Sequence, residues 1–118
     1  MNKYFLLLCF LQLFFSCIPS KEPKLTIVNN SDIDYDSIKV FTTIEKPTIF
    51  YNVLIDSRVK GKILFNSKKK GDGCYKINLF NDGSLIKKEC FGYYTNGASG
   101  NYSFKVMIEK DTIRIESK

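Results

Sequence analysis

The sequence predicts an all-β fold, and three observations lead to this prediction. From Lys24 onward, apolar and polar residues alternate with a period near two, as they do in strands with one buried face. Turn residues recur at intervals of about eight to twelve positions, which is typical of short sandwich strands. No window of this region sustains the i, i+3, i+4, i+7 pattern of an amphipathic helix. Seven or eight short antiparallel strands in a chain of 118 residues favour one β-sandwich domain at 24–118, with a small barrel as the alternative.

The first half of this domain supplies four of the expected strands. The polar segment 29–32 ends the first of them, Pro47 precedes the third, and Asp56-Ser57 turns the chain into the fourth. In the fourth strand, Val59, Gly61, Ile63 and Phe65 share one face, while Lys60 and Lys62 point the other way. These strands are expected at residues 25–28, 37–42, 48–53 and 59–65.

The second half supplies four more strands. Asn81-Asp82-Gly83 is typical of a hairpin turn, and Lys110-Asp111 joins the last two strands. The segments 68–73 and 95–101 are rich in Gly, Lys, Asn or Ser and are expected to be loops. The strands of this half are expected at residues 75–79, 85–91, 102–109 and 112–116.

The start of the fifth expected strand carries a family resemblance. Asp72-Gly73-Cys74-Tyr75 resembles the start of a late strand in immunoglobulin-like domains, where a Tyr that follows Gly and Asp makes a tyrosine corner. The resemblance implies that the sandwich is immunoglobulin-like.

Cys74 and Cys90 lie on the two arms of the hairpin, and its register decides whether they meet. A three-residue loop at 81–83 places residues whose numbers sum to 164 opposite each other, so that the two cysteines face one another. A two-residue turn at Asp82-Gly83 gives a sum of 165 and places Cys90 opposite Tyr75. Both registers remain open, so the pair is either a disulfide, which would contribute about 3 kcal/mol, or two free thiols.

The N-terminus is expected to be a signal segment rather than part of the fold. Lys3 precedes the run Tyr4 to Phe15, which is apolar apart from Gln12. A helix of that length would rise only about 18 Å, short of the ~30 Å hydrocarbon core of a bilayer. The run therefore fits the apolar region of a signal peptide better than a membrane span.

The residues that end this run resemble a known processing site. Phe14-Phe15-Ser16-Cys17 resembles the lipobox of bacterial lipoproteins, in which a small residue precedes the lipidated cysteine. The resemblance implies a signal peptide at 1–16 and lipidation of Cys17. It also implies that residues 17–23 are a tether, which holds the domain to the outer membrane of the bacterial cell envelope. Ordinary secretion is the alternative. Whether the domain faces the periplasm or the cell surface remains open.

Acidic residues after the first strand have the pattern of a calcium loop. Asp32, Asp34 and Asp36 match its D-x-D-x-D opening, but Ser37 and Thr43 occupy the positions that require Gly and Glu. We therefore expect no metal here, and instead an acidic turn whose carboxylates cap backbone donors.

Basic residues cluster around the fourth strand and the loop that follows it. Arg58, Lys60 and Lys62 lie on the strand, and Lys68-Lys69-Lys70 follow. Anionic lipid headgroups, acidic glycans or an acidic protein could bind such a patch. The alternative is a solvated strand face on which lysines discourage edge-to-edge pairing.

The segment from Phe91 to Gly97 combines aromatic residues with Gly and Asn. Aromatic faces stack on sugars and anchor protein contacts, so a protein or glycan could bind here. The alternative is a strand end that covers the sandwich edge, and adjacent Tyr93 and Tyr94 would then point to opposite faces. The residues predicted to bind are Phe91, Tyr93, Tyr94, Asn96 and Tyr102.

Composition narrows the function to binding. The chain has no His, which excludes a Ser-His-Asp triad, a Cys-His pair and His-ligated metal sites. No carboxylate pair stands out as an acid and base. We therefore expect a non-catalytic, lipid-anchored envelope protein that has no cofactor. We expect this protein to bind another macromolecule, but not nucleic acid. The alternative is a small periplasmic inhibitor or immunity-type protein that blocks an enzyme by inserting a loop.

Overall fold

A computed structural model describes residues 22–42, 46–64, 71–95 and 98–118. Cys17, Thr43, Phe65, Lys68-Lys69-Lys70 and Asn96 lie outside the described residues. The described residues contain no helix that is long and apolar enough to cross a membrane. They form nine strands: β1 (Lys24–Asn29), β2 (Tyr35–Phe41), β3 (Thr48–Val53), β4 (Arg58–Lys62), β5 (Asp72–Asn81), β6 (Ser84–Thr95), β7 (Ala98–Ser99), β8 (Ser103–Ile108) and β9 (Ile113–Ser117).

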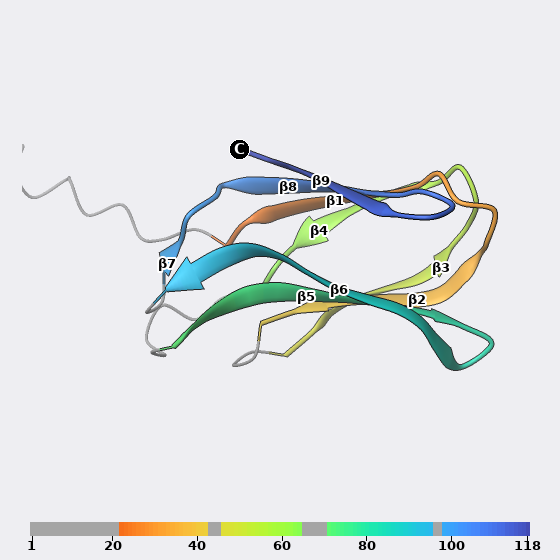
Figure 1. Ribbon diagram of the computed structural model, residues 1–118, viewed down its shortest axis with the longest axis horizontal. Coiled ribbons are helices and arrows are strands. Elements are labelled where there is room, and N and C mark those ends of the chain that lie inside the picture. The colour runs from red at the N-terminus through yellow and green to blue at the C-terminus, as the bar shows by residue number, and fades with distance from the viewer. Residues whose placement is uncertain (1–21, 43–45, 65–70, 96–97) are drawn as a thin grey trace, which may run out of the picture.

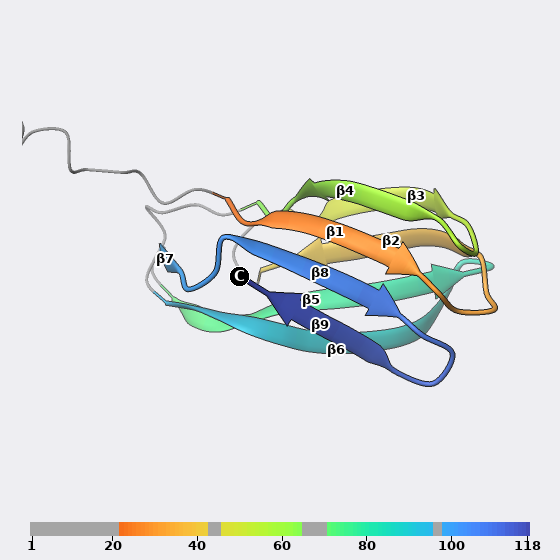
Figure 2. The ribbon, with the colours of Figure 1, turned by 90° about the horizontal axis from the view of Figure 1, so that it is seen from above.

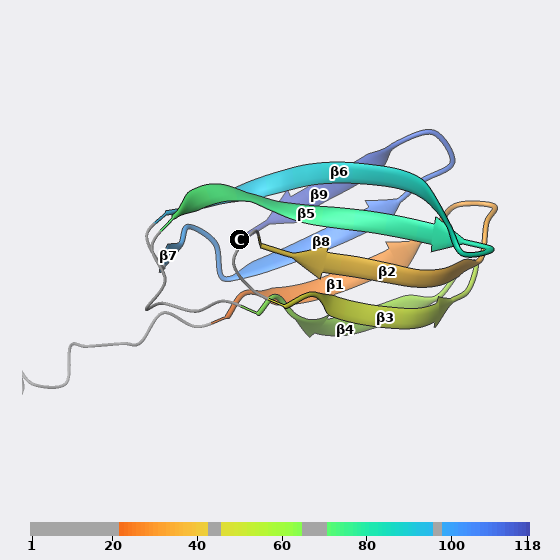
Figure 3. The same ribbon diagram turned by 90° about the horizontal axis from the view of Figure 1, so that it is seen from below.

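The strands form two sheets that pack face to face, which confirms an all-β sandwich (Figure 1). One sheet has four strands in the order β4-β1-β8-β9, as the view from above shows (Figure 2). The other has five strands in the order β3-β2-β5-β6-β7, and it is seen from below in Figure 3. Each strand turns its apolar side chains toward the other sheet because successive residues of a strand point to opposite faces.

One pairing differs from the antiparallel arrangement that we expected. β1 lies parallel to β8, with Leu25 opposite Phe104 and Ile27 opposite Val106. Strands joined by a tight hairpin must be antiparallel, but most of the domain separates β1 from β8, so the connection leaves their direction free. The strand count also exceeds the expected seven or eight because Ala98–Ser99 pairs with the end of β6.

The hairpin of β5 and β6 follows neither predicted register over its whole length. Its two-residue turn places Asn81 opposite Ser84 and Phe80 opposite Leu85, as one alternative required. An irregularity between Leu79 and Phe80 then shifts the pairing by one residue, and a second one follows between Gly73 and Tyr75. β-Bulges of this kind add a residue to one strand and depend on packing beyond the turn.

A disulfide joins Cys74 to Cys90 across this hairpin. Because of the first shift, Lys76 rather than Tyr75 or Cys74 lies opposite Cys90. Cys74 is the diagonal neighbour of Cys90, and their Cα atoms are 5.7 Å apart, within the range that a disulfide spans.

Aromatic residues fill one end of the core. Tyr75, Phe91, Tyr94 and Phe104 are buried, and their ring centroids lie 5.2–5.7 Å apart in the contacting pairs. Gly92 makes this packing feasible, since it has φ of +63° and a Cβ there would lie 2.8 Å from the ring of Phe104. The cluster joins the two sheets because Phe104 belongs to β8 and the others to β5 and β6.

Candidate binding surfaces

The aromatic segment that we predicted as a binding loop is mostly strand. β6 continues through Thr95, and Phe91 and Tyr94 are 6% and 0% exposed, respectively. Buried side chains cannot contact a partner, so the prediction that these two residues bind is wrong. They stand an odd number of positions apart yet both face inward, because the backbone departs from regular strand geometry at Gly92.

Tyr75 does not form the expected tyrosine corner. Its hydroxyl donates to Ser99 Oγ at 2.7 Å, and Ser99 Oγ donates to the carbonyl of Asn101 at 2.9 Å. A tyrosine corner would instead bond to backbone a few residues upstream. Burial raises the pKa of Tyr75 above its ordinary value, although the hydrogen bond between Tyr75 and Ser99 opposes that increase.

Two tyrosines of the predicted set are exposed. Tyr93 is 57% exposed and Tyr102 is 84% exposed. The backbone of Tyr102 is held firmly, since its N–H donates to a backbone oxygen of Lys118 at 2.7 Å and its carbonyl accepts from the N–H of Lys24 at 2.9 Å. Tyr102 therefore presents an aromatic ring to solvent from a fixed position.

The outer face of the four-stranded sheet is rich in cations. On β1 and β8 the alternate residues Leu25, Ile27, Phe104 and Val106 are buried in the core, so Lys24 and Lys105 face outward. The pairing places Lys24 opposite Lys62, and Thr26 lies between Lys60 and Lys105. We define the basic face by its cations, which are Lys24, Arg58, Lys60, Lys62, Lys105, Arg114 and Lys118.

Few carboxylates balance these cations. Glu116 lies opposite Lys105 on the same face. Glu109, beyond the end of β8, accepts from Arg114 Nε at 2.8 Å and lies 2.7 Å from its terminal nitrogen, so Arg114 is already paired. The other cations of the face are therefore the ones most able to bind an anion.

Protection of the sheet edge against pairing with another sheet explains only some of the cations on this face. β4 is an edge strand, and lysines on an edge discourage pairing with another sheet. Lys24 and Lys105, however, lie on the inner strands β1 and β8, where no edge needs protection. Like charges directly opposite each other also destabilise a sheet, as Lys24 and Lys62 must. An anionic ligand would account for both observations.

Three hollows lie over the part of the basic face between Lys118 and Lys60. The largest, about 770 Å³, is lined by Glu22, Lys24, Lys62, Tyr102, Ser103 and Lys118. Two neighbouring hollows of about 460 and 550 Å³ lie over Thr26, one toward Lys60 and the other toward Lys105. They are open grooves between rows of side chains on the outer face of the sheet, and such a surface suits an extended ligand.

The sequence revealed only one strand of this face. Arg58, Lys60 and Lys62 were recognised because they alternate along a single segment. The remaining cations come from three other strands and from Lys118, which follows β9, and only the sheet order β4-β1-β8-β9 brings them together. Alternation along each strand predicts which of these side chains point outward, but it does not predict the order of the strands in the sheet.

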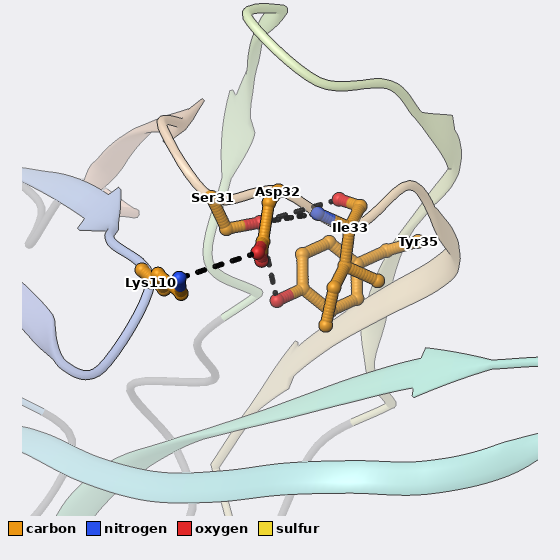
Figure 4. A network of polar contacts seen from close by, with 5 residues as sticks. All are labelled: Ser31, Asp32, Ile33, Tyr35 and Lys110. Carbon is orange, nitrogen blue, oxygen red and sulfur yellow. Dashed lines mark hydrogen bonds and ion pairs between the residues drawn. The ribbon is translucent and has the colours of Figure 1, made fainter.

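The three acidic residues of the calcium-like motif serve different partners. Asp34 accepts from the N–H of Ile55 at 2.8 Å and Asp36 accepts from the N–H of Gly83 at 3.0 Å, so both cap backbone donors as predicted. Asp32 lies 3.9 Å from Lys110 Nζ (Figure 4). Among the described residues there is no group of three metal-ligating side chains.

Hydrogen bonds hold the turn that carries these aspartates. Ser31 Oγ accepts from the N–H of Ile33 at 3.2 Å and lies 3.5 Å from the hydroxyl of Tyr35 (Figure 4). Buried Asn29 donates to the carbonyls of Ile33 and Val53 and accepts from Ser31. The acidic turn is therefore structural.

The comparisons with known proteins leave these surfaces as the guide to function. No family model matches the chain, and no curated protein or solved structure shows significant similarity to it.

Proposed function

We propose that this protein is a lipid-anchored, non-catalytic module of the bacterial cell envelope that binds an acidic glycan through its basic face. One observation carries the proposal: all four strands of one sheet contribute cations to its outer face, whereas the only acidic residue within these strands is Glu116. The anchor rests on the lipobox-like Phe14-Phe15-Ser16-Cys17, and residues 17–23 are the tether.

A glycan suits this face better than a protein partner. Protein interfaces have an apolar, desolvated centre, whereas the middle row of the basic face consists of Lys60, Thr26, Lys105 and Glu116. Neighbouring strands lie about 4.8 Å apart, and alternate residues along a strand about 6.7 Å apart. A polymer with a carboxylate or phosphate on successive units can engage several cations of such a grid.

The alternative function is a small periplasmic inhibitor or immunity-type protein that blocks an enzyme by inserting a loop. The described part of the aromatic segment gives this alternative no specific support, because it is paired in strands. Residues 91–95 belong to β6, and Ser99 pairs with Tyr94 on its neighbour.

We also propose that the sandwich is immunoglobulin-like. Immunoglobulin domains place strands B and E together in one sheet and strands C, F and G together in the other. β1 with β4 and β2 with β5 and β6 reproduce these neighbours, and β3 takes the place of C′ beside β2. β8 occupies the position next to β1 that strand A holds in the family, but it runs parallel to β1, and β9 lies beyond it at the edge of the sheet.

Charge reversal tests glycan binding. The chain from residue 17 onward, with Cys17→Ser, retains the whole core, whose first residue is Leu25. Binding to an acidic polysaccharide is measured by calorimetry against a neutral one at low and high salt. We expect salt-sensitive binding to the acidic polymer alone, and Lys60→Glu with Lys105→Glu should weaken it at least about 30-fold.

A matched control separates a site from net charge. Lys76→Glu with Lys88→Glu changes the charge equally on the five-stranded sheet, at two exposed residues. It should weaken binding less than about three-fold. Equal losses for the two pairs, or equal binding to the neutral polymer, would overturn the glycan proposal.

The anchor has a separate test. Cys17→Ala in the full chain should move the protein from the membrane to the soluble fraction of cells. Retention of this variant on membranes after a high-salt wash would contradict lipidation of Cys17.

A further inference from the structure

We infer that one end of the basic face docks on anionic lipid headgroups and sets the orientation of the anchored domain. This end, the anchored end, consists of Lys24, Lys62, Lys118 and Tyr102 around the largest hollow. The inference rests on the proposed lipid anchor but is independent of the glycan.

The position of β1 brings this end to the membrane. Lys24 is the first residue of β1 and lines the hollow. Glu22, two residues earlier in the chain, also lines it. An extended segment from 17 to 23 spans at most about 25 Å. A lipid on Cys17 therefore keeps the anchored end, more than any other part of the domain, close to the bilayer.

The charges of the anchored end fit an anionic bilayer. Lys24 and Lys62 are direct cross-strand neighbours, and the hollow extends from them to Lys118, with Glu22 the one acidic residue on its lining. Each basic residue near an anionic surface raises the binding constant about five-fold, so three together contribute about 100-fold. The attraction extends over roughly a Debye length of 10 Å, a distance that the tether allows.

Tyr102 supplies the second element of an interfacial site. Its ring is 84% exposed, and its backbone is bonded to both Lys24 and Lys118. Tyrosine rings concentrate at membrane–water interfaces because one end is apolar and the other hydrated. Exposed aromatic surface placed among three lysines suits headgroups better than it suits bulk water.

Docking through this end would leave the rest of the basic face free. Lys60 and Lys105 lie one row further along the strands than Lys24 and Lys62, and Arg58 lies another row beyond. The domain would then stand on its anchored end with the glycan-binding part of the face directed away from the bilayer.

Vesicle binding without the lipid anchor tests the inference. The chain from residue 17 with Cys17→Ser is sedimented with vesicles of phosphatidylglycerol and phosphatidylcholine, and with phosphatidylcholine alone. We expect binding only to the anionic vesicles. Lys24→Gln, Lys62→Gln and Lys118→Gln together should weaken it about 100-fold, whereas the matched triple Arg58→Gln, Lys60→Gln and Lys105→Gln should weaken it less than about ten-fold.

A spectroscopic readout reports on Tyr102 directly. The chain has no Trp, so Tyr102→Trp introduces a single tryptophan, whose emission can be excited apart from that of the tyrosines, and it keeps an amphipathic ring at the site. Its emission should shift to shorter wavelength with anionic vesicles and be quenched by brominated lipid. Tyr51→Trp, at a 69% exposed position on β3, is the matched control and should not respond.

The outcomes distinguish lipid from glycan. Absence of binding to anionic vesicles, equal effects of the two triple variants, or an unshifted Tyr102→Trp spectrum would overturn the inference. It would also be overturned if the anchored-end variants lost glycan binding but kept vesicle binding, since the hollow would then belong to the glycan site. Failure of the Lys60 and Lys105 glycan test alone would leave the lipid inference standing.

Discussion

The two sheets of the sandwich share a core but have unlike outer faces. The five-stranded sheet carries stabilising contacts on its outside, including the Cys74–Cys90 disulfide and Lys39, whose Nζ lies 4.9 Å from the centroid of the Phe80 ring. The four-stranded sheet instead places Lys24 opposite Lys62. Like charges at that position lower the stability of the fold. Contacts that stabilise the fold account for the outer face of the five-stranded sheet, and the lack of such contacts between Lys24 and Lys62 is the basis of our proposal that the other face binds a ligand.

The largest expected effect concerns the point where the sheets meet. Gly92→Ala would place a Cβ 2.8 Å from Phe104 and put Ala at φ of +63°. The unfavourable backbone and the overpacking together should lower the free energy of unfolding by about 3–4 kcal/mol, measured by denaturant titration.

Gly83→Ala provides the control for this substitution. Gly83 also has a positive φ, of +73°, but nothing lies within 4 Å of a Cβ there. It should cost about 1 kcal/mol. Equal costs at the two glycines would show that the aromatic cluster is not tightly packed between the sheets.

The disulfide should stabilise one sheet without affecting the other face. Replacing Cys74 and Cys90 with Ser opens a loop with a sequence separation of 16 and should cost about 3 kcal/mol in thermal unfolding. Because the bond lies in the five-stranded sheet, glycan affinity of the folded variant should stay within about two-fold. A large loss of affinity would mean that the two faces are coupled.

The strands could be predicted because each is encoded locally. β3 was expected at 48–53 and spans Thr48–Val53, and the outward Lys60 and Lys62 of β4 were read from alternation alone. The physical reason is that burial of one face imposes a period of two on the sequence.

The register and the binding face could not be predicted because they depend on distant contacts. The inward position of both Phe91 and Tyr94 needs an irregular backbone at Gly92, which is stabilised by Phe104 of the opposite sheet. The basic face likewise depends on β1 lying beside β8, far away in the sequence. The alternation of apolar and polar residues along a strand encodes neither the backbone irregularity at Gly92 nor the pairing of β1 with β8.

A smaller effect is expected from Tyr75 of the five-stranded sheet, whose contribution to the stability of the fold depends on pH. Burial raises its pKa, so the folded state keeps its proton to higher pH than the unfolded state. Its contribution to stability is complete below pH about 10 and is lost as pH rises through the folded pKa. Tyr75→Phe should cost about 1 kcal/mol at pH 7, from the lost bond to Ser99, and should reduce the decline of stability above pH 10. An unchanged alkaline decline would exclude Tyr75 as its source.

The smallest expected effect is a difference in glycan affinity between two cations of the basic face, Arg114 and Lys60. Arg114 is bonded to Glu109, whereas Lys60 faces Thr26 across the sheet, so their positive charges are not equally available to a ligand. Arg114→Gln should therefore change glycan affinity less than about two-fold, whereas Lys60→Gln should lower it about five-fold, both by calorimetry. The exposed Arg114–Glu109 pair contributes at most about 1 kcal/mol to stability, so neither variant should unfold. Glu109→Gln frees Arg114 and should raise affinity slightly. Equal losses for Arg114→Gln and Lys60→Gln would mean that the ligand responds to the summed charge of the face rather than to its unpaired cations.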